Sequence, residues 1–297
     1  MIGYQLLFVL VTLVAILLGS EASASHPPNI VLFLIDDLGW RDLGCQGSSY
    51  YQTPHIDKLA SDGTRFTNAY SACAVCSPTR AAILTGRYPW QLEEAANHQP
   101  YFPAKYKVFT EVLAEQEIYC GGAGKRWGPG DAKLSDGSPR DFAMKSVESN
   151  PPAAPGAGLS AFLRERPADS PFFYWFGSSN PHRPYELDSG IAAGKKLSDI
   201  DRVPAYWPDN ETIRRDMLDY AIEIEAFDAQ VGSLLTALEA SGLMNNTLVI
   251  VTSDHGMPFP RVKGHTFDDA HHIPFVAFWP EGIVRPGRRV ADFINFI

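Results

Sequence analysis

A continuous apolar run near the start of the chain, Asn29–Ile35 (NIVLFLI), constrains the fold more than any other feature of the sequence. Successive side chains of a strand point to opposite faces of a sheet, so a run without polar alternation predicts a strand buried on both faces. Strands of this kind belong to parallel sheets that are covered by helices. Asp36 and Asp37 follow at once, and in open α/β folds functional residues gather at the carboxyl ends of strands.

The rest of the chain alternates between strand-like and helix-like patterns. Apolar runs predict further strands at residues 118–121, 171–177, 247–252 and 273–279. Apolar periodicity and helix-boundary residues predict helices at 54–62, 77–84, 109–116 and 211–241. We also expect a loop at 151–158, an irregular excursion near the functional site at 178–209, and the first turns of an amphipathic helix at 291–297. The alternation predicts an α/β layered fold in one large domain.

Charge and the N-terminus restrict the partners of the protein. The formal net charge is −9 and no basic run exists, which argues against a nucleic-acid partner. Residues 6–18 form an apolar run too short for a comfortable membrane span, and Ala22-Ser23-Ala24 offers a small-residue cleavage site. We therefore expect a signal peptide at 1–24, cleavage near Ala24, export, and no stable membrane partner. The alternative is an uncleaved N-terminal anchor.

Cysteine is scarce for an exported protein. The four residues are Cys45, Cys73, Cys76 and Cys120, which is too few for a disulfide framework. Cys73 and Cys76 form a C-x-x-C pair, which could indicate a redox pair or half of a zinc site. No second C-x-x-C accompanies it.

The pentapeptide Cys76-Ser77-Pro78-Thr79-Arg80, followed by AAILTGR, resembles the signature of the sulfatase family. Without its neighbours, a buried cysteine before a proline-initiated turn would explain it equally well. The resemblance implies an alkaline-phosphatase-like α/β/α sandwich with a large mixed, mainly parallel sheet. It also implies that a formylglycine-generating enzyme converts Cys76 to Cα-formylglycine, whose hydrate is the nucleophile. The resemblance covers only the N-terminal part of the family, so we expect a catalytic domain at 25–297 without the C-terminal subdomain.

The same resemblance implies one divalent cation, Ca²⁺ or alternatively Mg²⁺. Its matching ligands are Asp36, Asp37, Asp254 and His255, with Cys76 as formylglycine. Carboxylate oxygens are the hard donors that these cations prefer. A lone Asp-Asp pair would more simply be a helix cap or loop pair. His255 departs from the asparagine that is more frequent at its position in heparan-type members, and imidazole is a softer donor.

The remaining site residues follow from the family motifs. The resemblance implies that Arg80 holds the nucleophile and that Lys125 and Lys263 bind sulfate. It also implies that His182 protonates the leaving group, a role that the near-neutral pKa of imidazole suits. Many sulfatases have a histidine two residues after this lysine, and it assists release of the covalent intermediate. This chain has Trp127 there, which puts that assistance in doubt at this position. Taken alone, each of these residues could be an ordinary loop residue or one member of a surface ion pair.

Two arginines are candidates for substrate binding. Arg183 could bind a sugar carboxylate or sulfate with two hydrogen bonds, and Arg261 is the reserve for Lys263. The segments that contain Lys125, His182 and Lys263 most resemble sulfamidases, the heparan N-sulfatases. His265, His271 and His272 match no ligand pattern, and we interpret them as substrate-loop or surface residues.

These features predict hydrolysis of sulfate esters or sulfamates on a sulfated carbohydrate, with heparan-type N-sulfate favoured. One alternative is a phosphomonoester or phosphonate hydrolase of the alkaline phosphatase superfamily, although those relatives mostly use Thr or Ser and two metals. The other alternative is a non-catalytic glycan-binding or defective truncated product, because the chain stops soon after an apolar segment that a longer protein would bury.

Overall fold

The computed structural model describes residues 27–146 and 155–297, so the expected signal peptide lies outside the described residues. Seven strands form one sheet in the order β4-β6-β1-β7-β8-β2-β9. In chain order their bounds are β1 Asn29–Ile35, β2 Thr64–Tyr70, β4 Tyr119–Gly124, β6 Phe172–Gly177, β7 Thr247–Ser253, β8 His272–Phe278 and β9 Arg288–Ile294. A two-stranded sheet joins β3 (Tyr101–Phe102) to β5 (Asp131–Ala132).

The central strands are parallel. β1 runs parallel to β6 and to β7, and β4 runs parallel to β6. β8 is antiparallel to β7 and to β2, and β9 is parallel to β2. Every residue of β6 is buried, as is all of β1 except Ile30. The parallel central strands that the apolar runs predicted, and the mixed, mainly parallel sheet that the family resemblance implied, are therefore confirmed.

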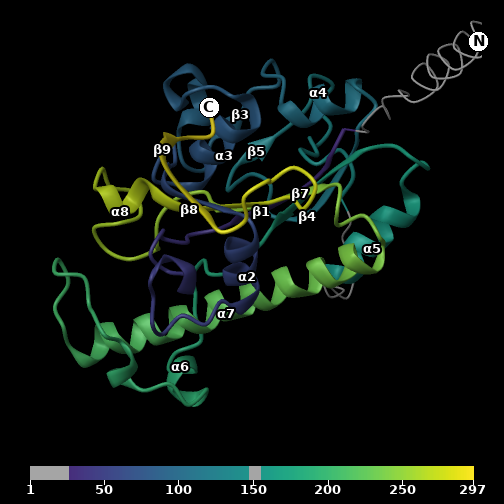
Figure 1. Ribbon diagram of the computed structural model, residues 1–297. Helices are drawn as coiled ribbons and strands as arrows, with labels where there is room; N and C mark the ends of the chain where they lie inside the picture. The colour runs from purple at the N-terminus through teal and green to yellow at the C-terminus, as the bar shows by residue number, and fades with distance from the viewer. Residues whose placement is uncertain (1–26, 147–154) are drawn as a thin grey trace, which may run out of the picture.

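Helices cover both faces of this sheet (Figure 1). Their bounds are α2 Pro54–Asp62, α3 Cys76–Thr85, α4 Phe109–Glu115, α5 Pro155–Glu165, α6 Ser189–Ala192, α7 Glu211–Ala240 and α8 Asp268–His271. Residues of α2, α5 and α7 pack with Phe33 and Ile35 on one face, whereas residues of α3 and α4 pack with Leu32 and Leu34 on the other. Alternate residues of β1 thus anchor two separate cores.

Helix α7 is the longest element and follows the sequence pattern closely. Asn210 caps its first turn, because the Asn210 side chain accepts a hydrogen bond of 3.0 Å from the backbone N–H of Ile213. Ile224, Phe227 and Val231 of its apolar stripe are fully buried. None of the helices in the described part of the chain is long and apolar enough to span a lipid bilayer.

Two local predictions are wrong. Residues 155–158 belong to α5 and not to a loop, and the other half of the predicted loop lies outside the described residues. Residues 291–294, predicted as the start of a helix, belong to strand β9. There Asn68 of β2 donates a side-chain hydrogen bond of 2.7 Å to the Ala291 carbonyl, and the ring of Phe293 stacks on Tyr70. The hydrogen-bonding edge of β2 therefore decides the conformation of residues 291–294, although their own apolar pattern suits a helix.

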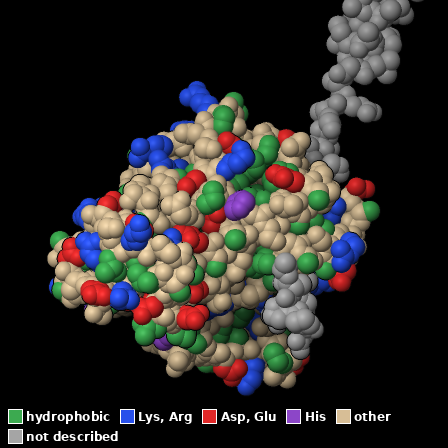
Figure 2. All heavy atoms as spheres, turned by 90° about the horizontal axis from the view of Figure 1, so that it is seen from below, with side chains coloured by type: hydrophobic (Ala, Val, Ile, Leu, Met, Phe, Trp, Pro, Cys, Tyr) green, Lys and Arg blue, Asp and Glu red, His purple; other side chains and the backbone are tan. Residues whose placement is uncertain are grey.

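Charged side chains are distributed without a dominant sign. Figure 2 shows acidic and basic groups interspersed over the face that carries α7, with no extended basic patch.

Candidate active site

Two neighbouring parallel strands bring the predicted acidic residues together. β1 and β7 pair in register up to their last residues, so Asp36 and Asp254 follow at the same edge of the sheet. The backbone N–H of Asp37 donates a hydrogen bond of 3.2 Å to Asp254 Oδ1, and His255 Nε2 lies 3.1 Å from Asp37 Oδ1. Asp37 adopts a left-handed φ of 74°, which marks a sharp turn directly after the strand. All four side chains are buried.

Helix α3 presents Cys76 to these side chains from its first residue. The Cys76 Sγ atom lies 3.2 Å from Asp36 Oδ1 and 3.3 Å from His255 Nε2. The sequence separations are 40 and 179 residues, so only the tertiary fold creates this contact. The motif cysteine is therefore at the centre of the acidic strand ends.

A buried arginine compensates the carboxylates from the same helix. Arg80 is 0% exposed and donates a hydrogen bond of 2.8 Å from Nε to Asp254 Oδ2. Its Nη2 atom lies 3.6 Å from Asp36 Oδ1, and Nη1 donates to the Lys125 carbonyl at 2.7 Å. Cys76 and Arg80 are four residues apart, and this spacing places both side chains on one face of α3.

Two lysines complete the charge balance. Lys125 Nζ donates a hydrogen bond of 2.6 Å to Asp36 Oδ2, and Lys263 Nζ donates to both carboxylate oxygens of Asp37 at 2.7 and 2.8 Å. Both lysine side chains are about one-fifth exposed, so each links the buried carboxylates to the solvent. We call the six residues Asp36, Asp37, Asp254, Arg80, Lys125 and Lys263 the carboxylate–cation cluster.

The electrostatic environment of Cys76 favours the protonated form of its thiol. Burial, followed by the charges of Asp254, Asp36 and Asp37, raises the pKa of the Cys76 thiol well above its usual range. For Asp36, burial opposes ionisation, but Arg80 and Lys125 outweigh it and hold the pKa of that carboxyl well below its usual range. A thiol in this environment stays protonated and is a poor nucleophile, since the thiolate is the reactive form.

The buried donors fit a hard divalent cation. Ligand atoms of Asp36, Cys76, Asp254 and His255 lie within 4.8 Å of one another, and Asp37, Cys76 and His182 form a second such group. His255 Nδ1 lies 3.0 Å from the Gly256 carbonyl, so Nδ1 carries the proton and the Nε2 lone pair faces the group. Two of the four ligand atoms in the first group are carboxylate oxygens, the donors that Ca²⁺ and Mg²⁺ prefer.

The C-x-x-C pair does not form a redox or zinc site. All four cysteines are free, and Cys73 belongs to none of the potential metal-binding groups among the described residues. Cys73 instead accepts hydrogen bonds through its backbone carbonyl from Ser71 and Thr79 just before and within α3.

The loop after β6 brings His182 to the edge of the cluster. His182 Nε2 lies 3.9 Å from Asp37 Oδ2, and the side chain is 38% exposed, so it faces both the cluster and solvent. Arg183 points elsewhere. Its guanidinium pairs with both carboxylate oxygens of Asp216 on α7 and donates at 2.9 Å to the Pro258 carbonyl. These bonds anchor the loop and occupy most of the donors that sugar binding would need.

Arg261 also lies outside the cluster. It is exposed, and its guanidinium lies 5.7 Å from the centre of the Phe267 ring. Of the two basic residues considered after β7, only Lys263 reaches the carboxylates. The three downstream histidines are likewise apart from the potential metal-binding groups described above: His265, His271 and His272.

Trp127 supports the start of α3. Its indole Nε1 donates a hydrogen bond of 3.1 Å to the Ser77 carbonyl, and its ring packs against Phe102 and Phe142. A tryptophan cannot exchange protons as a histidine does, so the contribution of this side chain is positional.

Sequence reasoning missed two neighbours of the site. Burial and the positive charges of Lys263, Lys125 and His255 lower the pKa of His98, so this imidazole is within electrostatic reach of the cluster. Tyr220 of α7 places its hydroxyl 2.9 Å from the Asp37 carbonyl. His98 stands in no motif, and Tyr220 looked like one more apolar position of a helix stripe.

Comparison with known proteins gives the family. The sulfatase family model matches residues 28–297. Arylsulfatase A from Homo sapiens is 31% identical over 91% of this chain and 62% of that protein. An ulvan-active sulfatase from Formosa agariphila is 30% identical over 94% of this chain and 54% of that protein. The chain thus spans less than two thirds of the length of these two curated relatives.

A solved structure supports the fold independently. The phosphonate monoester hydrolase of Agrobacterium radiobacter superimposes with a TM-score of 0.69 over 91% of this chain and 69% of that chain, at 19% sequence identity. This likeness concerns the fold alone, and it agrees with the expected alkaline-phosphatase-like α/β sandwich. The match of the sulfatase family model over residues 28–297 shows that the chain belongs to the sulfatase family.

Proposed function

We propose that this protein hydrolyses sulfate monoesters or sulfamates on sulfated glycans. The observation that supports this most directly is the position of Cys76, a buried thiol in contact with two potential metal ligands. A thiol placed there is unsuited to direct attack, but it is well placed as the precursor of another nucleophile. Converted to formylglycine, the residue would supply a hydrated aldehyde, with one hydroxyl to attack sulfur and a second to release sulfate.

The side chains around Cys76 supply the remaining needs of the reaction. Arg80, four residues along α3, offsets negative charge that develops on the nucleophile. Lys125 and Lys263 bind different carboxylates of the cluster and their side chains are partly exposed, so both could bind oxygens of an incoming sulfate. Asp36, Asp37, Asp254 and His255 would hold the divalent cation, which supplies Lewis-acid polarisation of a sulfate oxygen when bound.

His182 is the proposed proton donor for the leaving group. It stands at the edge of the cluster, 3.9 Å from Asp37 Oδ2, and it is the member of the site most open to solvent. An oxygen or nitrogen leaving group needs a proton as its bond to sulfur breaks, and imidazole is suited to this transfer near neutral pH.

The proposed substrate class is a sulfated carbohydrate, with heparan-type N-sulfate favoured by the motifs around Lys125 and His182. The Formosa agariphila relative is named for activity on ulvan. We further propose that the protein is exported after cleavage near Ala24, that residues 25–297 are catalytic-domain sequence, and that a formylglycine-generating enzyme acts on Cys76. The alternatives are a phosphonate or phosphomonoester hydrolase, which the likeness to the phosphonate monoester hydrolase keeps open, and a non-catalytic glycan binder.

Matched substrates test the proposed function. We expect purified protein to release sulfate from 4-nitrophenyl sulfate and from N-sulfated and O-sulfated glucosamine at least about a hundredfold faster than phosphate or phosphonate from matched esters, because groups placed for one substrate can discriminate against another by several kcal/mol. Ion chromatography of released sulfate and phosphate gives the rates. Faster phosphonate release would establish the first alternative, and no turnover of any ester would favour the non-catalytic one.

The proposed cation site predicts a calcium-dependent stability. Saturating Ca²⁺ at about 100 times Kd should stabilise the fold by about 2.7 kcal/mol, because an ion that binds only the folded state shifts the unfolding equilibrium. Melting curves in chelator and in Ca²⁺ should therefore differ by several degrees. Asp254→Asn should remove most of this difference. Asp228→Asn is the matched control, because Asp228 is equally buried but accepts backbone hydrogen bonds of α2 far from the site. An equal calcium shift in all three proteins would rule out this cation site.

A further inference from the structure

Two turns carry the potential cation ligands, and buried hydroxyl groups fix the backbones of both. One turn follows β1 and carries Asp36 and Asp37, and the other follows β7 and carries Asp254 and His255. Asp37 and Asp254 are 217 residues apart in the chain. A Ca²⁺ ion bound by both turns needs them at one fixed spacing, because its ligands must all lie about 2.3–2.6 Å from the same point. The side chains that set this spacing therefore matter to the site as the ligands do.

Tyr220 of α7 holds the turn after β1. Its side chain is 0% exposed, and its hydroxyl lies 2.9 Å from the carbonyl oxygen of Asp37. Asp37 has a left-handed φ of 74°, a conformation that is unfavourable for a residue with a Cβ atom. A buried carbonyl oxygen that loses its donor is also unfavourable. The tyrosine hydroxyl therefore stabilises this strained turn in the conformation that the structure shows.

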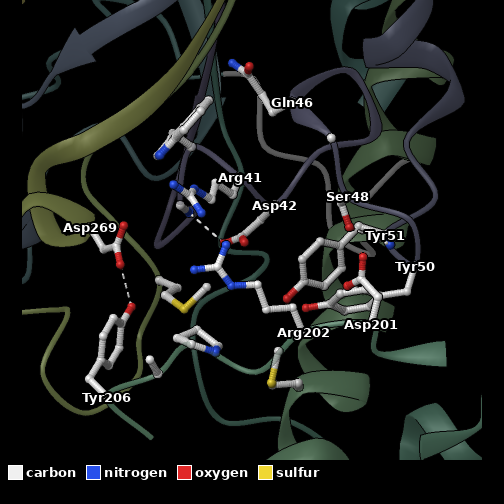
Figure 3. A pocket seen from close by; sticks show the side chains of 17 residues that line it. Arg41, Asp42, Gln46, Ser48, Tyr50, Tyr51, Asp201, Arg202, Tyr206 and Asp269 are labelled. Carbon is white, nitrogen blue, oxygen red and sulfur yellow. Dashed lines mark hydrogen bonds between the residues drawn. The ribbon is translucent and has the colours of Figure 1, made fainter. Parts of the chain in front are cut away.

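Asp42 keeps the Tyr220 hydroxyl in place. The Asp42 Oδ2 atom lies 2.9 Å from that hydroxyl and accepts a hydrogen bond of 3.1 Å from the Gly39 N–H. Figure 3 shows Asp42 at the wall of a cavity of about 440 Å³, which none of the six residues of the carboxylate–cation cluster lines. Among the described residues, Asp42 belongs to neither group of potential metal ligands. It therefore acts on the turn through Tyr220 and Gly39, not as a ligand.

Ser253 joins the two turns directly. It is the last residue of β7 and is 0% exposed. Its Oγ atom accepts a hydrogen bond of 3.0 Å from the Leu38 N–H and donates one of 2.8 Å to the His255 carbonyl. A hydroxyl can accept and donate at the same time, which no other group of this size can do. One side chain thus connects the residue after Asp37 to the backbone of His255.

A neighbouring hydroxyl shows what an ordinary structural bond looks like on the same strand. Thr252 is 0% exposed and donates a hydrogen bond of 2.8 Å to the carbonyl of Pro274 in β8. That bond links two strands, whereas the bonds of Ser253 and Tyr220 end on the turns that carry the ligands. Loss of a group that orients metal ligands weakens metal binding by about 10–100-fold, so the two kinds of bond can be told apart by experiment.

We propose that Tyr220 and Ser253 are positioning residues, which hold the turns after β1 and β7 at the spacing that a bound divalent cation requires. The proposal rests on the cation site of the proposed sulfatase reaction. Both hydroxyls act through backbone atoms of the turns. They keep the ligand set ordered before the cation binds, which lowers the entropic cost of binding.

Calorimetric titration of the chelator-treated protein with CaCl₂ tests the proposal. Tyr220→Phe and Ser253→Ala each remove one oxygen atom, and each should weaken Ca²⁺ binding about tenfold or more. Thr252→Val is the matched control, because it removes an equally buried hydroxyl that does not bond either turn, and it should keep the wild-type Kd. Circular dichroism in chelator verifies that each variant is folded before the titration.

The outcomes separate this proposal from the proposed function. Wild-type Ca²⁺ affinity in both Tyr220→Phe and Ser253→Ala would overturn the positioning roles and leave the proposed hydrolysis intact. An equal loss of affinity in Thr252→Val would also overturn them, because any buried hydroxyl would then have the same effect. Absence of Ca²⁺ binding by the wild type would overturn the cation site and this proposal together. Weaker binding in both variants, in a protein that releases no sulfate from any ester, would support the positioning roles and refute only the proposed hydrolysis.

Discussion

Replacement of Cys76 by alanine should reduce sulfate release by at least about three orders of magnitude, because it removes the proposed nucleophile and its precursor. The Cys76 side chain is completely buried between Asp36 and His255, and alanine leaves that packing with only a small cavity. The fold should therefore survive, so that lost activity reports on chemistry. Ion chromatography of released sulfate, with circular dichroism as the folding check, provides the measurement.

Two further proteins sharpen this result. Cys73→Ala, three residues away and outside the cluster, should keep wild-type activity. Cys76→Ser retains one hydroxyl but cannot form a geminal diol, so it should not complete a catalytic cycle. Mass spectrometry of the peptide that contains residue 76 should show a mass roughly 18 Da below that of cysteine, whereas ordinary oxidation only adds oxygen. Full activity in Cys76→Ala would end the proposed mechanism.

Replacement of Arg80 by methionine should cost about 3–5 kcal/mol of folding stability, because it leaves buried carboxylates without their main cation. Arg80 is 0% exposed and bonds Asp254 directly, and its charge contributes to the low pKa of Asp36. Methionine retains much of the side-chain volume, so the loss is mainly electrostatic. For a domain of this size the melting temperature should fall by about 10 °C.

An exposed ion pair provides the contrast. Lys58 pairs with Asp62 across one turn of α2, and Lys58→Met should leave the melting temperature nearly unchanged, since water already screens such pairs. Ca²⁺ should restore part of the stability of Arg80→Met, because a divalent ion would offset the same carboxylates. A melting temperature for Arg80→Met equal to that of the unmodified protein would mean that the carboxylates are neutral in the fold.

Much of the site could be predicted from local sequence because its members follow strands. Asp36 comes directly after the apolar run of β1 and Asp254 directly after the last residue of β7, and parallel strands of this kind end at a common edge of the sheet. The helix at 211–241 was likewise readable from its apolar period. In each case burial of a single element leaves its own pattern in the sequence.

Other features depend on partners that no local pattern encodes. Residues 291–294 carry an apolar pattern that suits a helix, yet the free edge of β2 takes them as strand β9. Arg183 has the chemistry to bind a sugar, but Asp216 on α7 lies within reach and takes its guanidinium. His98 stands in no motif and approaches the cluster only through the fold.

The sequence by itself determined the class of fold, the strand ends that carry the acids, and the motif that identifies the family, because these depend on residues close together in the chain. Only the tertiary structure decided which cation meets which carboxylate and that Asp216 takes the guanidinium of Arg183. The physical reason is separation along the chain. The patterns of strands and helices depend on a few neighbouring residues, whereas a charge pair can join residues 226 positions apart.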